Sequence, residues 1–305
     1  MNLIILKLLL LCTFICVCLA NGGRPMADEY MKDENIYELN PSNFDKVIHK
    51  SNYTSIVKFY APWCGYCQKI KPVYRKLGKY LHEDGQYAVN VAAVNCDNPS
   101  NRALCSEYRI SGFPTIMVFR PPKYSGKKSK TNQKHVAETY NGERSLKAIT
   151  SHVASRVKNY VKSFPNLKSE RFKTWLKSDE DISKVVLIAK SQSVSLLYKT
   201  LAIDFLGSMK FGMISGVTSS DMMNVEGKDV EIKEEDLPQL FVYQSGTFIR
   251  YEKPDKLNKA HITEWLIKVT GNQPQEGTLS KKDKKFYSKY RKDKRGKKTS
   301  PHDEL

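Results

Sequence analysis

Long hydrophobic runs are scarce in this sequence of 305 residues. After residue 20, no segment approaches the roughly 20 consecutive apolar residues that a membrane-spanning helix needs. We therefore expect no transmembrane anchor in the processed chain. Motifs that bind a flavin or a nucleotide are also missing, so we expect no bound cofactor.

Cysteine is scarce too, and its distribution excludes an ordinary zinc site. The chain has seven cysteines, and none lies after Cys105. Cys64 and Cys67 have the spacing of half a zinc site, which needs a second close pair of Cys or His ligands. Cys96 and Cys105 have eight residues between them, and no two histidines have ligand spacing. We therefore expect no metal.

Both ends of the chain have the pattern of targeting signals. Within residues 1–20, Lys7 precedes an apolar stretch (8–19) that is too short to span a membrane, and we expect cleavage after Ala20. An uncleaved signal anchor is the alternative. Residues 302–305 read HDEL, a retention signal of the endoplasmic reticulum that a receptor reads. We expect residence in the lumen of the endoplasmic reticulum, with the HDEL receptor as a partner.

Four cysteines and one glycosylation sequon matter in that compartment. Removal of the signal takes three cysteines away, and the remaining four permit three disulfide pairings. Proximity favours a redox-active disulfide between Cys64 and Cys67, which leaves Cys96 to pair with Cys105. Asn52 begins the only N-x-[ST] sequon without a central proline, so it is a predicted glycosylation site.

Apolar runs alternate with helical segments in the first half of the chain, which predicts a mixed α/β sheet covered on both faces. The expected strands are 57–61, 87–94, 115–119 and 138–140, and the expected helices are 64–81, 100–108 and 145–161.

The same order recurs, more faintly, in the second half. The expected strands are 184–189, 210–215, 237–243 and 248–251, and the expected helices are 193–206 and 261–269. Pro114 and Pro238 begin corresponding strands. Pro114 lies 20 residues after Val94, and Pro238 lies 24 residues after Ile214, both in the preceding strands. The pattern indicates a duplicated fold whose second copy has no cysteine; two unrelated α/β domains are the alternative.

A basic tail follows the second copy. Residues 281–298 hold eleven Lys or Arg against two Asp, half of the formal net charge of +18. With almost no apolar periodicity, this segment is predicted to be disordered. It is either a solvated spacer that presents HDEL or an electrostatic arm for acidic partners or lipid headgroups. Nucleic acid is excluded as a partner by the compartment.

The residues around the first cysteine pair predict a redox site. An apolar strand (55–61) is followed by Pro62 and Trp63, then by CGYC (64–67) and a periodic helical segment. This order places Cys64 at a turn and Cys67 in the first turn of the helix. Unpaired N–H groups and the helix dipole favour an anion there, so they stabilise a thiolate at Cys64. Such a thiolate attacks disulfides, and Cys67 is close enough to close a ring behind it.

The motifs APWCGYC, VNCD…LCSEYRISGFPT and YNGER resemble the thioredoxin superfamily and, more narrowly, a catalytic domain of the protein disulfide isomerases. The resemblance is strong over residues 34–160 and rests on the order of elements over 165–270. It implies two thioredoxin-like domains of α/β class, the first redox-active and the second inactive. The expected division of the chain is a signal peptide (1–20), a catalytic domain (30–160), an inactive domain (165–272) and a basic tail (273–305).

The resemblance also assigns roles to residues. Cys64 is implied to attack the client, and Cys67 to resolve the mixed disulfide. Pro114 matches a cis-proline loop beside the CxxC, although a trans bond is the default without the resemblance. Arg144 matches a mobile arginine that lowers the pKa of Cys67 by swinging inward. Cys96 and Cys105 resemble a structural disulfide, and the implied client-binding residues are Trp63, Tyr66, Phe113 and Thr115.

Two residues depart from the family pattern. Tyr66 stands where His is usual, and a neutral phenol cannot stabilise the Cys64 thiolate as a cationic imidazole does. We therefore expect a more reducing site that keeps its activity. Lys58 stands where a buried Glu usually relays protons. A buried neutral amine can accept a proton in its place, or the side chain can extend to solvent and have no chemical role.

The sequence thus predicts an enzyme of the endoplasmic reticulum that forms and rearranges disulfides in cysteine-containing secretory polypeptides. By the resemblance, its oxidising equivalents come from a flavin-dependent thiol oxidase of the lumen. The alternative is a redox-assisted chaperone or adaptor that holds clients through the inactive domain and tail, with lumenal chaperones as partners. A dedicated reductase is a third interpretation, which the redox potential distinguishes.

Overall fold

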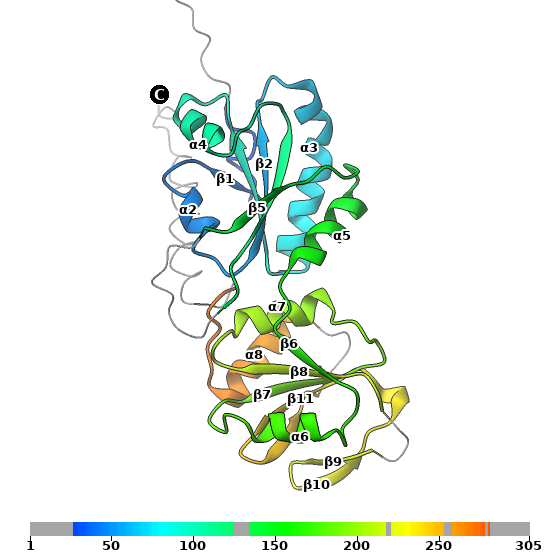
Figure 1. Cartoon of the computed structure of the whole chain (residues 1–305). Coiled ribbons are helices and arrows are strands. Elements are labelled where there is room, and N and C mark those ends of the chain that lie inside the picture. Colours follow the sequence, from blue (N-terminus) through cyan, green and yellow to red (C-terminus); the bar gives the residue numbers. More distant parts are fainter. Residues whose placement is uncertain (1–26, 125–133, 218–220, 253–257, 278–279, 281–305) are drawn as a thin grey trace, which may run out of the picture.

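The computed structural model describes residues 27–124, 134–217, 221–252, 258–277 and 280 of the chain. The predicted signal peptide, the strongly basic segment and HDEL lie outside the described residues. The described part forms two α/β units, one above the other in Figure 1. No helix within it is long and apolar enough to cross a membrane.

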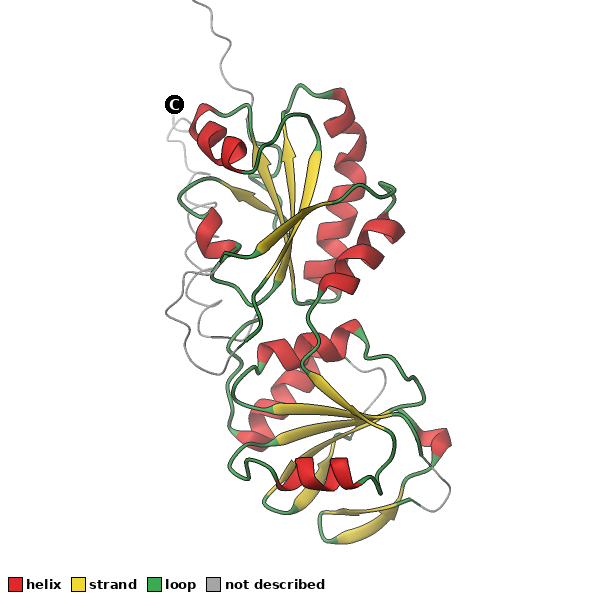
Figure 2. Ribbon diagram, viewed as in Figure 1, coloured by secondary structure: helices red, strands yellow, loops and turns green. Residues whose placement is uncertain are grey.

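The first unit is a five-stranded sheet with helices on both faces (Figures 1 and 2). The strand order is β1-β3-β2-β4-β5; β1, β3 and β2 are parallel, and β4 and β5 are antiparallel to their neighbours. The strands are β1 (Tyr37–Leu39), β2 (Thr54–Tyr60), β3 (Val89–Asn95), β4 (Thr115–Arg120) and β5 (Val136–Thr139). The helices are α2 (Phe44–Val47), α3 (Gly65–Gly78), α4 (Arg102–Glu107) and α5 (Leu146–Arg156), with a π-helical extension of α3 (Lys79–Asp84) and a 3-10 turn before α4 (Pro99–Asn101).

Strand β2 lies at the centre of this sheet and is buried along its whole length. Because successive side chains of a strand point to opposite faces, Ile56 and Tyr60 pack under α3 and α5, whereas Val57 and Phe59 pack under α2 and α4. Lys58 has the same parity as Ile56 and therefore points to the apolar face under α3. The central strand thus places a lysine beneath the helix that carries the CGYC motif.

The second unit repeats this topology in a seven-stranded sheet of order β10-β9-β12-β11-β7-β8-β6. Strands β6, β8, β7, β11 and β12 have the order and directions of β1, β3, β2, β4 and β5, which confirms the expected duplication. The strands are β6 (Val161–Phe164), β7 (Lys184–Ile188), β8 (Lys210–Ile214), β9 (Met222–Val225), β10 (Lys228–Glu231), β11 (Gln239–Gln244) and β12 (Thr247–Arg250). The helices are α6 (Glu170–Lys177), α7 (Leu196–Asp204) and α8 (Lys259–Thr270), with a 3-10 turn (Glu234–Asp236).

The strands and helices expected from the sequence are present, with one substantial error in length. The helix expected over 145–161 ends at Arg156, and Val161 already begins β6. The apolar residues Val157 and Val161 extended the helical pattern in the sequence. In the structure Val157 lies just after α5 and Val161 is the first residue of β6. Short elements were missed, namely β1, α2, β6, α6 and the β9–β10 hairpin. The hairpin follows β8 in the chain as α4 follows β3, but it extends the edge of the second sheet beside β12.

Buried polar contacts fix the second unit to the first. Asp204, at the end of α7, accepts hydrogen bonds from the Tyr53 hydroxyl and, at 2.8 Å, from Lys259 Nζ. After α8 the chain returns to the first unit, where the Glu276 carboxylate accepts hydrogen bonds of 3.2 Å from the backbone and side-chain nitrogens of Asn52. Burial raises the pKa of Asp204, against the opposing charge of Lys259.

This contact lies at the pole of the first unit that is remote from Cys64. Tyr53 precedes β2 and Cys64 follows it, and seven strand residues span about 20 Å. Figure 1 shows the second unit below the first, away from the start of α3.

We predict that Asp204→Ala weakens this contact strongly. The Lys259 side chain is only 6% exposed, so the change leaves its ammonium group buried without a carboxylate partner. Loss of one partner from a buried ion pair costs about 3–5 kcal/mol, which urea unfolding measures as a lower free energy of unfolding. The exposed Asp181 is the matched control, and Asp181→Ala should change the free energy by less than about 0.5 kcal/mol. Equal effects of the two changes would show that the contact does not stabilise the protein.

Candidate active site

The CGYC motif lies where β2 leads into α3, as the sequence predicted. Cys64 is the N-cap of α3, with extended backbone angles, and the helix begins at Gly65. Cys64 is 8% exposed and Cys67 is fully buried. Both are free cysteines, so the structure shows the dithiol form, and the redox-active disulfide between them stays a prediction.

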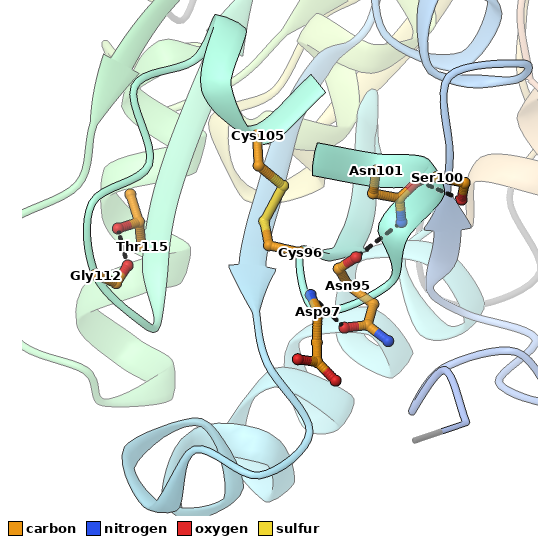
Figure 3. Close-up of a disulfide and its surroundings, with 8 residues drawn as sticks. All are labelled: Asn95, Cys96, Asp97, Ser100, Asn101, Cys105, Gly112 and Thr115. Atoms are coloured by element: carbon orange, nitrogen blue, oxygen red, sulfur yellow. Dashed lines mark hydrogen bonds between the residues drawn. A yellow bond between two sulfur atoms is a disulfide. The ribbon is translucent and has the colours of Figure 1, made fainter. Parts of the chain in front are cut away.

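The loop before β4 lies against the first cysteine. The Phe113–Pro114 peptide bond is cis, and the Cys64 thiol donates a hydrogen bond to the Phe113 carbonyl at 3.5 Å. The Thr115 hydroxyl donates to the Gly112 carbonyl at 2.7 Å, which closes the loop on itself (Figure 3). The structure therefore brings Phe113 and Pro114 to the candidate nucleophile, as the resemblance implies.

Aromatic side chains flank the cysteines. Trp63 and Phe113 form an edge-to-face pair with ring centroids 6.1 Å apart. Trp63 is 61% exposed and Tyr66 is 67% exposed, which is unusual for large apolar side chains. Lys69 Nζ lies 5.4 Å from the centre of the Tyr66 ring. The surface beside Cys64 is therefore apolar and open to solvent.

The two thiols differ in acidity. Burial raises the pKa of Cys64, but hydrogen bonds from the Cys67 thiol and from the backbone N–H groups of Cys67 and Tyr66 outweigh it, so the pKa lies below that of an ordinary thiol. Burial and the hydrogen bond to Cys64 raise the pKa of Cys67 to about 12. Cys64 is thus suited to be the nucleophile, whereas Cys67 is protonated at neutral pH and needs help to react.

Lys58 is enclosed beneath these thiols. Its side chain is fully buried, so the alternative in which it extends to solvent is wrong. Its Nζ atom donates hydrogen bonds to the Tyr30 hydroxyl at 2.8 Å and to the Cys67 carbonyl at 3.2 Å. The ring centroids of Tyr30 and Tyr60 lie 5.0 and 4.9 Å from Lys58 Nζ. Burial lowers the pKa of the Lys58 amine, against the opposing influence of Glu29 and Cys67.

The acidic partner of Lys58 comes from the segment before β1, and sequence reasoning missed it. Glu29 Oε2 lies 3.6 Å from the Nζ atoms of both Lys58 and Lys71, and the Glu29 side chain is 6% exposed. The Glu29 backbone N–H donates to the Tyr60 hydroxyl at 2.7 Å, which fixes the segment against β2. No local pattern marks Glu29, because it lies in a short polar segment just before the expected domain boundary at residue 30. Its only signal is the buried lysine, which requires a counter-charge.

Two other predicted residues lie apart from the thiols. Arg144 is exposed at the start of α5, and among the described residues no hydrogen bond or ion pair joins it to Cys67. Its role at the resolving thiol stays a prediction. Asn52 lies at the remote pole, where its side-chain nitrogen is hydrogen-bonded to Glu276.

Cys96 and Cys105 form a disulfide with Cα atoms 6.0 Å apart, the pairing that the resemblance implies. It joins the residue after β3 to α4, close to the loop before β4 (Figure 3). In the described part of the chain, no group of three or more His, Cys, Asp or Glu side chains is placed to hold a metal ion.

Three comparisons show which known proteins this chain is similar to. The thioredoxin family model matches residues 35–155. The chain is 39% identical over 274 residues to the protein disulfide-isomerase MPD1 of Saccharomyces cerevisiae, covering 83% of this chain and 84% of that protein. It is 34% identical to a thioredoxin domain-containing protein of Schizosaccharomyces pombe that is labelled mitochondrial, covering 77% of this chain and 60% of that protein. Among solved structures it is similar to full-length ERdj5, with 15% identity and a TM-score of 0.44, covering 80% of this chain and 34% of ERdj5.

The pKa difference between the thiols predicts selective alkylation. In the reduced protein, iodoacetamide should modify Cys64 first, because only the thiolate reacts. The rate should rise with pH around a midpoint below about 8.5, the ordinary value for a thiol. Lys58→Met should raise this midpoint, because the protonated form of Lys58 is a positive neighbour of the Cys64 thiolate. Lys76→Met, which changes an exposed side chain on α3, is the matched control and should leave the midpoint unchanged. Preferential modification of Cys67, or a midpoint above the ordinary value, would contradict the assignment.

Proposed function

This chain belongs to the protein disulfide isomerase family of thiol–disulfide oxidoreductases, and on that premise we propose that it forms and rearranges disulfides in secretory proteins within the endoplasmic reticulum. One observation carries the proposal. A thiol of lowered pKa, Cys64, lies at the start of α3 beside a buried thiol whose pKa is raised to about 12, Cys67. In such a pair, Cys64 can attack as a thiolate while Cys67 stays protonated until the second step.

The first step forms a mixed disulfide. The Cys64 thiolate attacks one sulfur of a client disulfide, the client S–S bond breaks, and the departing client sulfur leaves as a thiolate that takes up a proton. The α3 N-terminus stabilises the attacking thiolate through its free N–H groups. The Phe113 carbonyl, 3.5 Å from Cys64 Sγ, offers a backbone acceptor to an extended client segment.

The second step releases the client. Cys67 loses its proton and attacks Cys64 Sγ, which forms the Cys64–Cys67 disulfide and expels the client thiol. Lys58 is proposed to accept that proton as a neutral amine, because burial favours its uncharged form. Glu29, 3.6 Å away, then stabilises the ammonium that results. Arg144 is proposed to assist the deprotonation of Cys67 when its loop swings inward.

Run in the opposite direction, the same steps oxidise a client dithiol and leave Cys64 and Cys67 reduced. The proposed electron acceptor is the flavin-dependent thiol oxidase of the lumen. The predicted signal peptide and HDEL support this compartment and the HDEL receptor as a partner, although one relative is labelled mitochondrial. Further parts of the proposal are glycosylation of Asn52, contacts of the basic tail with acidic partners, and lumenal chaperones as partners of the protein.

Replacing both active-site cysteines tests this function against the chaperone alternative. Cys64→Ser with Cys67→Ser should abolish refolding of scrambled ribonuclease, because no thiolate remains to exchange disulfides. Cys67→Ser alone should accumulate mixed disulfides with clients, since the resolving thiol is missing. Circular dichroism checks that the variants fold. Full retention of refolding by the double variant would instead favour a chaperone that holds clients without redox chemistry.

The proton relay predicts a specific defect in the second step. Lys58→Met should slow resolution of a preformed mixed disulfide, and Glu29→Gln should slow it less. A positioned base contributes roughly 100-fold or more, so a loss of that order is expected for Lys58→Met. In the wild type the rate should rise with pH as the amine loses its proton, at a pKa below that of an ordinary lysine. Lys76→Met and Glu34→Gln, which change exposed side chains, are the controls. An unchanged resolution rate in Lys58→Met would disprove the relay.

A further inference from the structure

Trp63, which lies beside Cys64, is exposed to solvent but held in place by a hydrogen bond. Trp63 is 61% exposed, yet its indole Nε1 donates a hydrogen bond of 2.9 Å to Asp97 Oδ1. Its ring meets Phe113 edge to face. A hydrogen bond to an ionised carboxylate is stronger than one between neutral groups, so it holds an exposed ring effectively. The orientation of Trp63 therefore depends on where Asp97 lies.

Asp97 is itself held in place by the loop that follows β3. Its backbone N–H donates to Asn95 Oδ1 at 3.0 Å, and the Asn95 carbonyl accepts from Asn101 Nδ2 at 2.8 Å (Figure 3). The neighbouring residue, Cys96, donates its N–H to the Tyr60 carbonyl at the end of β2, at 2.8 Å. The disulfide from Cys96 to Cys105 ties the same residue to α4. Asp97 thus follows a residue that is fixed on two sides.

We infer that Asp97, anchored by the Cys96–Cys105 disulfide, is a positioning residue that holds Trp63 in place as a client-binding surface beside Cys64. The inference rests on the proposed function and names what the site selects. Trp63, Phe113 and Tyr66 form an apolar rim, so the ligand class is an extended polypeptide segment with an aromatic or aliphatic residue next to its reacting cysteine. Small disulfides do not reach this rim, so their reaction with Cys64 does not depend on it.

Preorganisation is the physical reason for this role. An indole without a hydrogen-bond partner samples several rotamers in water. A client that binds it must then fix one rotamer, and the entropy lost lowers the affinity for the client. The Asp97 carboxylate orders the ring before the client arrives. The effect therefore belongs to client binding and not to the acidity of Cys64.

The same chain of contacts links client binding to the second disulfide. When a dithiol reductant attacks this disulfide, the Cys96–Cys105 bond breaks, two protein thiols form, and the reductant becomes a disulfide. The loop then loses its covalent tie to α4, and the Asp97 carboxylate is less well fixed. Client binding should weaken while Cys64 keeps its reactivity toward small disulfides.

Steady-state kinetics with two substrates test the inference. One substrate is a disulfide-bonded peptide with a phenylalanine beside each cysteine, and the other is hydroxyethyl disulfide. Asp97→Ala should raise KM for the peptide about three- to tenfold with little change in kcat, and should leave the small disulfide unaffected. Asp97→Asn keeps an oxygen acceptor and should restore most of the affinity. Cys96→Ala with Cys105→Ala should raise the same KM.

A spectroscopic signature separates positioning from general damage. The chain has three tryptophans, so fluorine NMR of protein labelled with 5-fluorotryptophan gives few signals, and Trp63→Phe assigns one of them. In Asp97→Ala and in the double cysteine variant, the Trp63 signal should shift while the other two stay unchanged. Asp84→Ala, at an exposed site with no described partner, is the matched control.

The outcomes are distinct. An unchanged peptide KM and an unmoved Trp63 signal in Asp97→Ala overturn the inference. An equal loss with both substrates also overturns it, because it indicates damage to the thiols. A wild-type protein that exchanges neither substrate disproves the proposed function instead, and the NMR signal still reports whether Asp97 holds Trp63.

Discussion

A lysine buried beneath a pair of thiols is the constraint on which this site depends. An isolated ammonium inside the apolar face of a sheet costs several kcal/mol, so Lys58 must either lose its proton or find partners. The protein supplies both options. Tyr30 and the Cys67 carbonyl accept its hydrogen bonds, and the Glu29 carboxylate lies 3.6 Å away. This arrangement makes the segment before β1 part of the active site and gives the resolving thiol a neighbour that can exchange a proton.

The chemistry and the domain contact occupy opposite ends of one strand. Cys64 follows β2 at one pole, and Tyr53 precedes it at the other, where Asp204, Lys259 and Glu276 join the two units. The second unit repeats the sheet order of the first but has no cysteine, and its described residues hold no lysine–glutamate pair beneath a helix start. It lies away from the start of α3, where Trp63 and Tyr66 are exposed beside Cys64.

Much of this could be predicted from local sequence. The apolar run before CGYC identified β2 and α3, and Pro114 and Pro238 marked corresponding strands of a duplicated fold. These features depend on neighbours in the chain, which is why pattern alone finds them. Glu29 and Asp97 could not be assigned, because their partners Lys58 and Trp63 are about 30 residues away and only the folded sheet brings them together. The helix expected over 145–161 was too long, since apolar residues in a connection between domains carry the same pattern as a helix.

The reduction potential of the Cys64–Cys67 pair, equilibrated with glutathione buffers, decides whether this site is poised to form disulfides. We expect a value between about −180 mV, typical of a disulfide isomerase, and about −270 mV, typical of thioredoxin. The α3 N-terminus and the protonated form of Lys58 stabilise the Cys64 thiolate and make the pair oxidising, whereas Tyr66 supplies no cationic imidazole to strengthen the effect. A value at or below about −270 mV would contradict a role in forming disulfides and would identify a dedicated reductase.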